Sequence, residues 1–193
     1  MKKLFLFFVM TGCFAASQAQ VKFGAKAGLN IADFAGKDAE GTKAKVGFHI
    51  GALVQLPLID KLSLQPELVF STQGAKENDE DGDLKMNVSY INVPVLAKYT
   101  FIEGLSAQSG PQFGFLISAK AKAEGEKVDM KDYFKKLDLS WVFGASYVTP
   151  MNIGFDLRYN LGLTKVGKGD IAGDAKVHNS VLQLGVFYLF GGK

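Results

Sequence analysis

The stretch MNIGFDLRYNLGL, residues 151–163, decides how the rest of this sequence is interpreted. From Ile153 to Leu163, large apolar residues alternate with glycine, Asp156, Arg158 and asparagine without a slip. A period of two puts successive side chains on opposite faces of a β-strand. One face is therefore apolar and aromatic, and the other carries charges that a packed core accepts only at high cost. A tilted strand crosses a bilayer in about 9–11 residues, so the stretch predicts a strand that faces lipid on one side.

A lipid-facing strand needs hydrogen-bonding partners on both edges, because unpaired backbone groups in hydrocarbon cost several kcal/mol each. The same alternation recurs seven more times, at residues 21–31, 46–56, 62–72, 88–101, 105–117, 137–147 and 181–190. The eight segments predict an all-β fold, an eight-stranded antiparallel up-and-down transmembrane β-barrel of the outer-membrane type. An eight-stranded soluble barrel would have the opposite polarity, with charge outside and an apolar lining.

The connections between these segments alternate between long and short. The long ones, at 33–43, 73–85, 119–136 and 165–176, are rich in charge and glycine. Outer-membrane barrels have short periplasmic turns and long extracellular loops, so we expect four extracellular loops. Segment 73–85 is too polar to cross a membrane and is expected to be a solvated loop, whereas 119–136 is expected to contain a helical turn.

The first nineteen residues have the layout of a secretory signal peptide. Lys2 and Lys3 precede an apolar run that ends at a small-residue site, Ser17 to Ala19. We expect cleavage between Ala19 and Gln20, which divides the chain into a signal at 1–19 and a barrel domain at 20–193. The alternatives are a membrane anchor helix, for which the run is short, and a lipoprotein signal at Cys13. On the preferred interpretation the mature protein has no cysteine and no disulfide.

The charge balance argues against one class of partner. The chain has 22 Lys and Arg against 19 Asp and Glu, a formal net charge of +3. Two of the lysines lie in the expected signal, so the mature protein is almost neutral. A nucleic-acid-binding surface is not expected from this composition.

Charged residues fall on the predicted inner face of the barrel, among them Lys22, and five of them are expected inside the lumen, namely Lys26, Glu67, Lys98, Asp156 and Arg158. They could line a proton or ion path, or they could pair with one another in a filled interior. Eight strands enclose a space just wide enough to be filled by side chains, and desolvated charges must pair. We therefore expect structural lumen charges and no open pore.

Candidates for catalysis and metal binding are weak. His49 could act as a base with Ser63 or Ser71, but no third, orienting group is identifiable. The acidic run from Asp79 to Asp83 resembles part of a calcium loop, yet the final glutamate of that motif is missing, since Val88 occupies its place. We expect no catalysis, no cofactor and no metal site, and a solvated loop at Asp79 to Asp83.

Four segments, VKFGAKAGLN at 21–30, LSLQPELVFSTQG at 62–74, YINVPVLAKY at 90–99 and FDLRYNLGL at 155–163, resemble the PorT-like family of outer-membrane β-barrel proteins of Bacteroidetes. The resemblance implies an eight-stranded barrel in the outer membrane that tolerates Pro66 and Pro94. One relative in that family is linked to protein secretion and gliding. The C-terminus departs from the simplest barrel-assembly signal, because Phe190 is followed by Gly191, Gly192 and Lys193.

These observations predict an integral outer-membrane protein with a structural or surface-interaction role. Its expected partners are outer-membrane lipid and lipopolysaccharide, the barrel-assembly machinery during insertion, and an extracellular protein or cell surface. The first alternative is an accessory role in secretion or outer-membrane assembly, as in PorT-like relatives. The second is a lipid-active barrel enzyme.

Overall fold

A computed structural model describes residues 21–35, 42–79, 82–123, 126–167 and 177–190 of the chain. The expected cleavage site at Ala19 and Gln20, Cys13 and the C-terminal residues 191–193 lie outside the described residues. Among the described residues, no helix is long enough and apolar enough to span a membrane.

The described residues form ten strands and one short 3-10 helix, most of them longer than the sequence pattern predicts. Their bounds are β1 Lys22–Ala35, β2 Thr42–Ile59, β3 Leu62–Gln73, β4 Ala75–Asp79, β5 Gly82–Ile102, β6 Leu105–Ala123, β7 Glu126–Asp129, η1 Lys131–Tyr133, β8 Leu137–Val148, β9 Ile153–Gly162 and β10 His178–Phe190.

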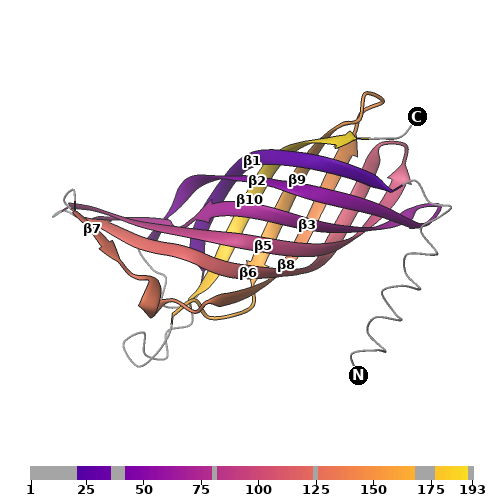
Figure 1. The fold of residues 1–193 in the computed structure, drawn as a ribbon. Coiled ribbons are helices and arrows are strands. Elements are labelled where there is room, and N and C mark those ends of the chain that lie inside the picture. The colour runs from indigo at the N-terminus through magenta and orange to yellow at the C-terminus, as the bar shows by residue number, and fades with distance from the viewer. Residues whose placement is uncertain (1–20, 36–41, 80–81, 124–125, 168–176, 191–193) are drawn as a thin grey trace, which may run out of the picture.

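Eight of the ten described strands close into a barrel (Figure 1). Going round the wall, β1 is followed by β2, β3, β5, β6, β8, β9 and β10, and every neighbouring pair is antiparallel. The first and last strands complete the ring, with Phe23 opposite Phe190 and Ala35 opposite His178. This ring confirms the predicted eight-stranded antiparallel barrel.

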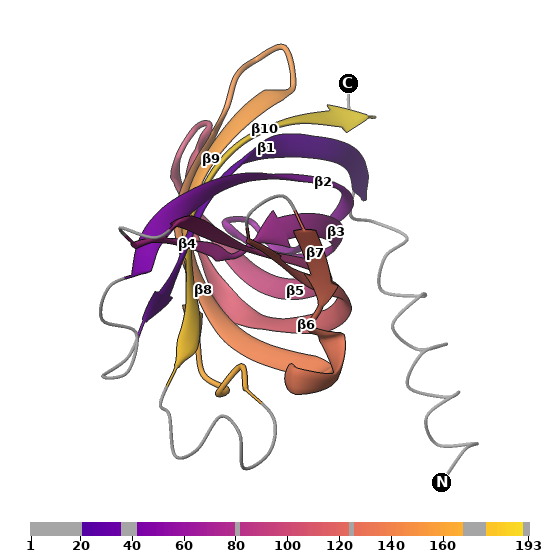
Figure 2. The same ribbon diagram turned by 90° about the vertical axis from the view of Figure 1, so that its left-hand side faces the viewer.

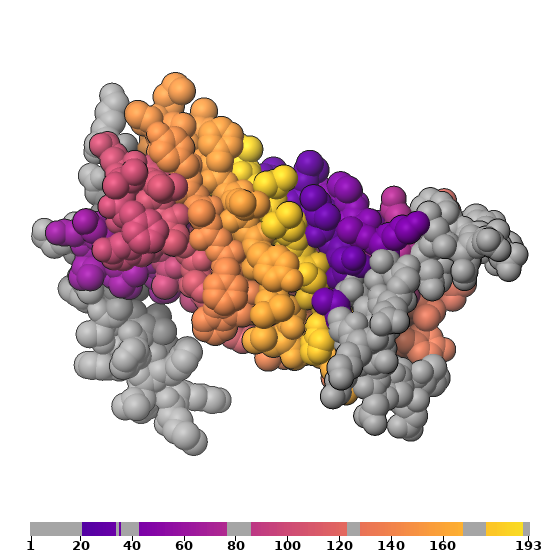
Figure 3. All heavy atoms as spheres, turned by 180° about the vertical axis from the view of Figure 1, so that it is seen from behind, coloured from indigo at the N-terminus to yellow at the C-terminus, as the bar shows by residue number. Residues whose placement is uncertain are grey.

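The barrel is apolar outside and polar inside. On β9, Phe155 and Leu157 are 51% and 48% exposed, whereas Arg158 between Leu157 and Tyr159 is only 2% exposed. Large apolar side chains cover the outer wall from β6 to β1 (Figure 3). We call the outward-facing side chains of this wall the lipid-facing band. The band belongs to the segments 23–31, 46–59, 62–70, 91–102, 105–117, 137–147, 153–163 and 182–190. The inverted polarity is that of a membrane barrel.

Aromatic side chains collect at the end of the barrel that has the short turns. Tyr99 packs edge-on against Phe101, and Tyr188 packs the same way against Phe190, with ring centroids 5.2 Å apart in both pairs. Tyr147 is exposed on the same side. Amphipathic rings of this kind favour the boundary between lipid and water, so they mark one edge of the lipid-facing band. By the rule for outer-membrane barrels, we expect the end with the short turns to face the periplasm, and we call the opposite end the outer end.

The expectation of a loop at residues 73–85 is wrong. Gly74, with a φ of 131°, interrupts the strand, and β4 then pairs with both β2 and β5. Hydrophobic alternation marks a strand only where one face meets lipid or a core. The sequence of β4, AKEND, lacks that alternation, and the segment was therefore mistaken for a loop.

Segment 119–136 is also more ordered than expected. β6 continues to Ala123, and β7 pairs with its end. The short 3-10 helix η1 follows, and it confirms the expected helical turn. Figures 1 and 2 show β4, β7 and the ends of β5 and β6 extending past the barrel wall on the side away from the short turns. We call β4, β7 and the segments of β2, β5 and β6 paired with them the outer sheet.

Candidate functional site: the barrel interior and its two ends

Glycines on the inner face make room for long charged side chains. A Cβ placed on Gly185 would lie 2.7 Å from the Oδ1 atom of Asp156, and one placed on Gly144 would lie 2.9 Å from the Cγ atom of Arg158. Contacts that short do not occur in real structures. The alternation of glycine with charged residues along the inner face is therefore what lets the charges fit inside an eight-stranded barrel.

Four of the five predicted lumen charges form one buried ion cluster. Arg158 donates through Nη1 to Glu67 Oε2 at 2.8 Å and through Nη2 to Glu67 Oε1 at 2.7 Å, a two-point contact. The Lys26 Nζ atom lies 3.3 Å from Glu67 Oε2 and 3.2 Å from Asp156 Oδ2. Arg158 Nη2 also lies 3.4 Å from Asp156 Oδ2. Two cations and two carboxylates thus compensate one another at the centre of the barrel.

Two glutamines complete this cluster and were not singled out in the sequence. Gln65 donates to Glu67 Oε1 at 2.7 Å, and Gln108 accepts from Arg158 Nη2 at 3.3 Å. Both occupy inward positions of the alternating pattern, and that pattern could have identified them. The ion cluster therefore draws on β1, β3, β6 and β9.

Lys98, the fifth predicted lumen charge, lies apart from the ion cluster. Its side chain is buried, and its Nζ atom has no hydrogen-bond partner among the described residues. The ammonium instead sits 5.3 Å from the centroid of the Phe187 ring, a cation–π geometry. The interior consequently holds one cation that no neighbouring carboxylate neutralises by direct contact.

His49 belongs to a layer of neutral side chains nearer the outer end. Its Nδ1 atom is 2.8 Å from Asn30 Oδ1, which also accepts a hydrogen bond from Gln183 at 2.9 Å. Asn30 in turn donates to Ser71 Oγ at 2.9 Å. Ser63 lies elsewhere and contacts Gln55. Within the described part of the chain, His49 is not hydrogen-bonded to a serine or to a carboxylate, so the residues considered for a base and nucleophile are not assembled as such.

An apolar cluster closes the outer mouth of the barrel. Phe134, which follows η1, and Val166, which follows β9, pack on the inward-facing Val88, Tyr90 and Leu116. Backbone bonds hold the two loops together, since Lys135 N donates to Val166 O at 2.9 Å and Phe134 forms a β-bridge with Gly167. Phe134 stands among charged residues in the sequence, and no periodic signal pointed to its role.

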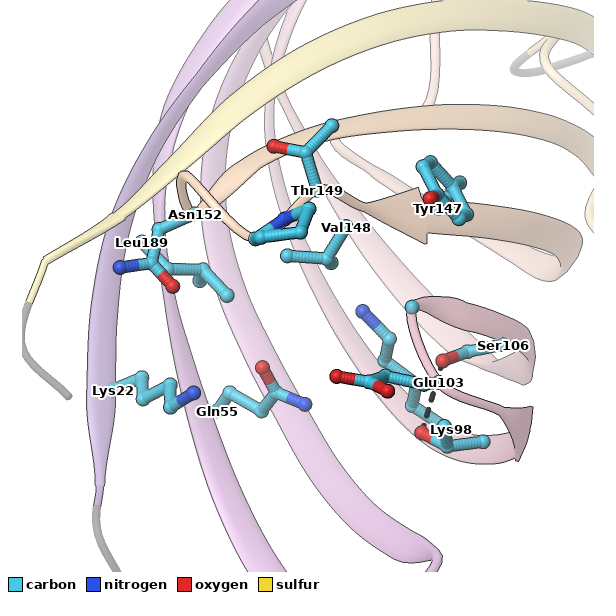
Figure 4. A pocket seen from close by; sticks show the side chains of 13 residues that line it. Lys22, Gln55, Lys98, Glu103, Ser106, Tyr147, Val148, Thr149, Asn152 and Leu189 are labelled. Carbon is cyan, nitrogen blue, oxygen red and sulfur yellow. Dashed lines mark hydrogen bonds between the residues drawn. The ribbon is translucent and has the colours of Figure 1, made fainter. Parts of the chain in front are cut away.

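A polar pocket of about 500 Å³ lies at the opposite, short-turn end. The turn at Gly104 and the turn from Thr149 to Asn152 form part of its rim (Figure 4). Asn152 adopts the left-handed conformation with a φ of 62°, which asparagine tolerates better than most residues. Its carbonyl accepts from Leu189 N at 3.0 Å and ties the turn to β10.

No metal site is found among the residues that the structure describes, since no three His, Cys, Asp or Glu side chains gather there. The acidic run from Asp79 to Asp83 is not part of that statement, because its side chains lie outside the described ones.

A closed hydrogen-bonded ladder, a lipid-facing exterior and an ion-paired interior together define an integral membrane β-barrel. The chain belongs to the outer membrane protein beta-barrel domain family, which matches residues 16–167. Membership of that family supports an outer-membrane location. This match does not test the narrower resemblance of the strand motifs to PorT-like proteins.

Solved structures share this fold. Neisserial surface protein A (NspA) superposes with a TM-score of 0.58 at 18% identity, covering 87% of this chain and 97% of that one. Ail, the attachment invasion locus protein of Yersinia pestis, has a TM-score of 0.50 at 18% identity, covering 89% and 99%. At such identities the likeness shows the fold alone. No curated protein matches the sequence.

Proposed function

We propose that this protein is a non-catalytic outer-membrane barrel that presents its loops and its outer sheet to an extracellular partner. The observation that carries this proposal is the outer sheet. β5 and β6 continue well past the lipid-facing band and pair with β4 and β7. This extension supports the proposal, because on the proposed orientation it would project from the cell surface.

The interior supports an outward-facing role rather than transport. The ion cluster fills the centre, and the apolar cluster around Phe134 covers the outer mouth. A solute would have to displace both a compensated set of buried charges and a dry apolar contact. The side chains that remain available to a large partner therefore lie outside.

The outer sheet has features that suit a protein partner. Val128 on β7 and Tyr133 in η1 are 55% and 46% exposed, and exposed tyrosine is common at interfaces. Among the described residues β7 pairs only with β6, which leaves one edge of its backbone open to another strand. Ail is named for attachment and invasion, but only its fold is shared here, so the proposal depends on this chain's own outer sheet.

A side-chain contact joins three barrel strands at the base of the outer sheet. Lys45 on β2 lies just beyond the lipid-facing band and donates to Asn87 Oδ1 on β5 at 2.5 Å and to Gln73 O on β3 at 3.4 Å. Burial, and after it the nearby charge of Lys76, lowers the pKa of Lys45. The contact links β2, β3 and β5 where the outer sheet begins.

The test compares three forms of the full chain in cells that lack the native gene. They are the unchanged protein, a variant in which residues 75–85 and 119–130 are replaced by short turns, and His49→Ala. We expect attachment of the cells to surfaces and to one another to be lost with the outer-sheet variant and kept with His49→Ala. Heat-dependent gel mobility verifies that each variant is a folded barrel.

Retained attachment with a folded outer-sheet variant would overturn the proposal. Loss of function with a folded His49→Ala protein would instead favour the lipid-active enzyme.

An accessory role in secretion or outer-membrane assembly is the second candidate, favoured by the four strand motifs that resemble PorT-like proteins. It predicts that deleting the gene changes the set of secreted proteins. Quantitative mass spectrometry of the culture medium separates the two roles, because a surface-interaction protein leaves that set unchanged.

We further propose that the chain is exported by a signal cleaved between Ala19 and Gln20, inserted by the barrel-assembly machinery, and surrounded by lipopolysaccharide in the outer leaflet. Intact-mass measurement of the membrane-inserted protein tests the first step. A mass that begins at Gln20 supports it, and a mass that retains residues 1–19 contradicts it.

A further inference from the structure

The pocket at the short-turn end has an excess of positive charge. Lys22 and Lys98 line it together with a single carboxylate, Glu103. In Figure 4 the Lys98 side chain extends from β5 toward the middle of the ring of labelled residues, with Lys22 on the opposite wall. The ion cluster does not offset this excess, because Lys26 and Arg158 already contact both of its carboxylates.

The Lys98 ammonium lacks a hydrogen-bond acceptor among the described residues, and an anion could supply one. Lys98 is 1% exposed, and its ammonium lies 5.3 Å from the centroid of the Phe187 ring. A poorly hydrated cation attracts an anion more strongly than one in bulk water, because the local dielectric constant is low. An oxyanion at the floor of the pocket would supply the charge-assisted hydrogen bond that Lys98 lacks.

Neutral polar side chains line the same pocket. Gln55 on β2 and Asn152 in the turn between β8 and β9 contribute amide groups from two sides (Figure 4). Amide donors can add hydrogen bonds to a tetrahedral group with several acceptor oxygens. Two ammonium groups also match a ligand that carries more than one negative charge.

We propose that this periplasmic pocket binds a phosphate group, with Lys98 and Lys22 as its cationic contacts. The group reaches the pocket from the periplasm, either on a small phosphomonoester or on the headgroup of a phospholipid. This site is separate from the outer sheet, so it does not depend on the role assigned to the exterior.

The experiment is a titration of the isotope-labelled full barrel in octyl glucoside micelles at low salt, followed through the backbone amide NMR signals of Gly104 and Asn152. One arm adds inorganic phosphate and then glycerol 3-phosphate. The other arm adds phosphatidic acid to the micelles. A lower half-saturation concentration for phosphatidic acid assigns the site to a lipid headgroup, and a lower one for glycerol 3-phosphate assigns it to a soluble ester.

The matched control is Lys61→Gln, which removes a lysine from the same end of the barrel but outside the pocket. We expect Lys98→Met to weaken phosphate binding about tenfold or more, as for the loss of a charge-assisted contact. Lys61→Gln should leave binding unchanged, and Glu103→Gln should strengthen it, because a like charge is removed from the rim.

Three outcomes would overturn the site. They are the absence of saturable shifts in the unchanged protein, equal weakening by Lys61→Gln and Lys98→Met, and weaker binding in Glu103→Gln. If Lys98→Met does not fold, as judged by heat-dependent mobility, Lys22→Gln and Glu103→Gln decide the matter, since both positions are at the pocket rim.

Discussion

At the scale of single residues, the stability of the barrel depends on buried charges that compensate one another. Glu67 accepts from Lys26, Arg158 and Gln65 at once. A buried set of this kind contributes little over an apolar replacement, but removing one member leaves the others uncompensated. The ion cluster is therefore sensitive to single substitutions in a way that exposed charges are not.

Glu67→Gln tests this sensitivity. It keeps the shape of the side chain but removes the charge that two cations share, and we expect it to lower the free energy of unfolding by about 3–5 kcal/mol. Urea titration of the protein in micelles measures the change. The control is Glu103→Gln, which removes an exposed carboxylate from a turn. It should change the free energy of unfolding by no more than about 0.5 kcal/mol. Equal effects of the two variants would contradict the role of the ion cluster.

The inner glycines give a second residue-scale prediction. Gly185→Ala places a methyl group 2.7 Å from Asp156 Oδ1, so Asp156 must move away from Lys26. Overpacking of this kind costs about 1–3 kcal/mol. Ala27→Val adds volume on the exposed outer face and should be close to neutral. The same urea titration compares them, and a neutral Gly185→Ala would show that the interior has spare room.

At the scale of elements, the period of two predicted all eight barrel strands and the side that each presents to lipid. The pattern was sufficient there because lipid outside and charge inside impose opposite demands on alternate residues. It was not sufficient for β4 and β7, which extend beyond the barrel wall and lack a regular apolar alternation. The sequence predicted five lumen charges, but which of them touch depends on strand register and tilt, so it did not predict the separation of Lys98 from the ion cluster.

β9 offers a direct test of how an element sits in the membrane. Leu157 lies mid-strand and Leu163 lies at the outer end, and both face lipid. Leu157→Arg should destabilise the barrel by about 2–4 kcal/mol, and Leu163→Arg by about 0–1 kcal/mol, because the cost of a charge falls from the bilayer midplane to its surface. Folding equilibria in lipid vesicles give both values. A larger effect at Leu163 would mean that the lipid-facing band has been placed wrongly.

At the scale of the whole molecule, the barrel is a filled cylinder with different ends. The ion cluster occupies its centre, the apolar cluster with Phe134 packs at the outer mouth, and the polar pocket opens at the short-turn end. We expect no steady conductance when the protein is reconstituted in a planar bilayer, since a permeating ion would have to displace the ion pairs at the centre and the apolar contacts at the mouth. Long-lived single-channel steps that disappear on denaturation would contradict this expectation.

The pairing of β1 with β10 has a consequence for how the protein is made. The ladder that seals the wall joins residues from the two extremes of the chain, Phe23 and Phe190. Contacts so distant along the chain make folding slow, and until the last strand arrives two unpaired strand edges remain open to aggregation. Closure of the ring therefore has to wait for β10. We expect a chain truncated before β10 to be degraded rather than inserted.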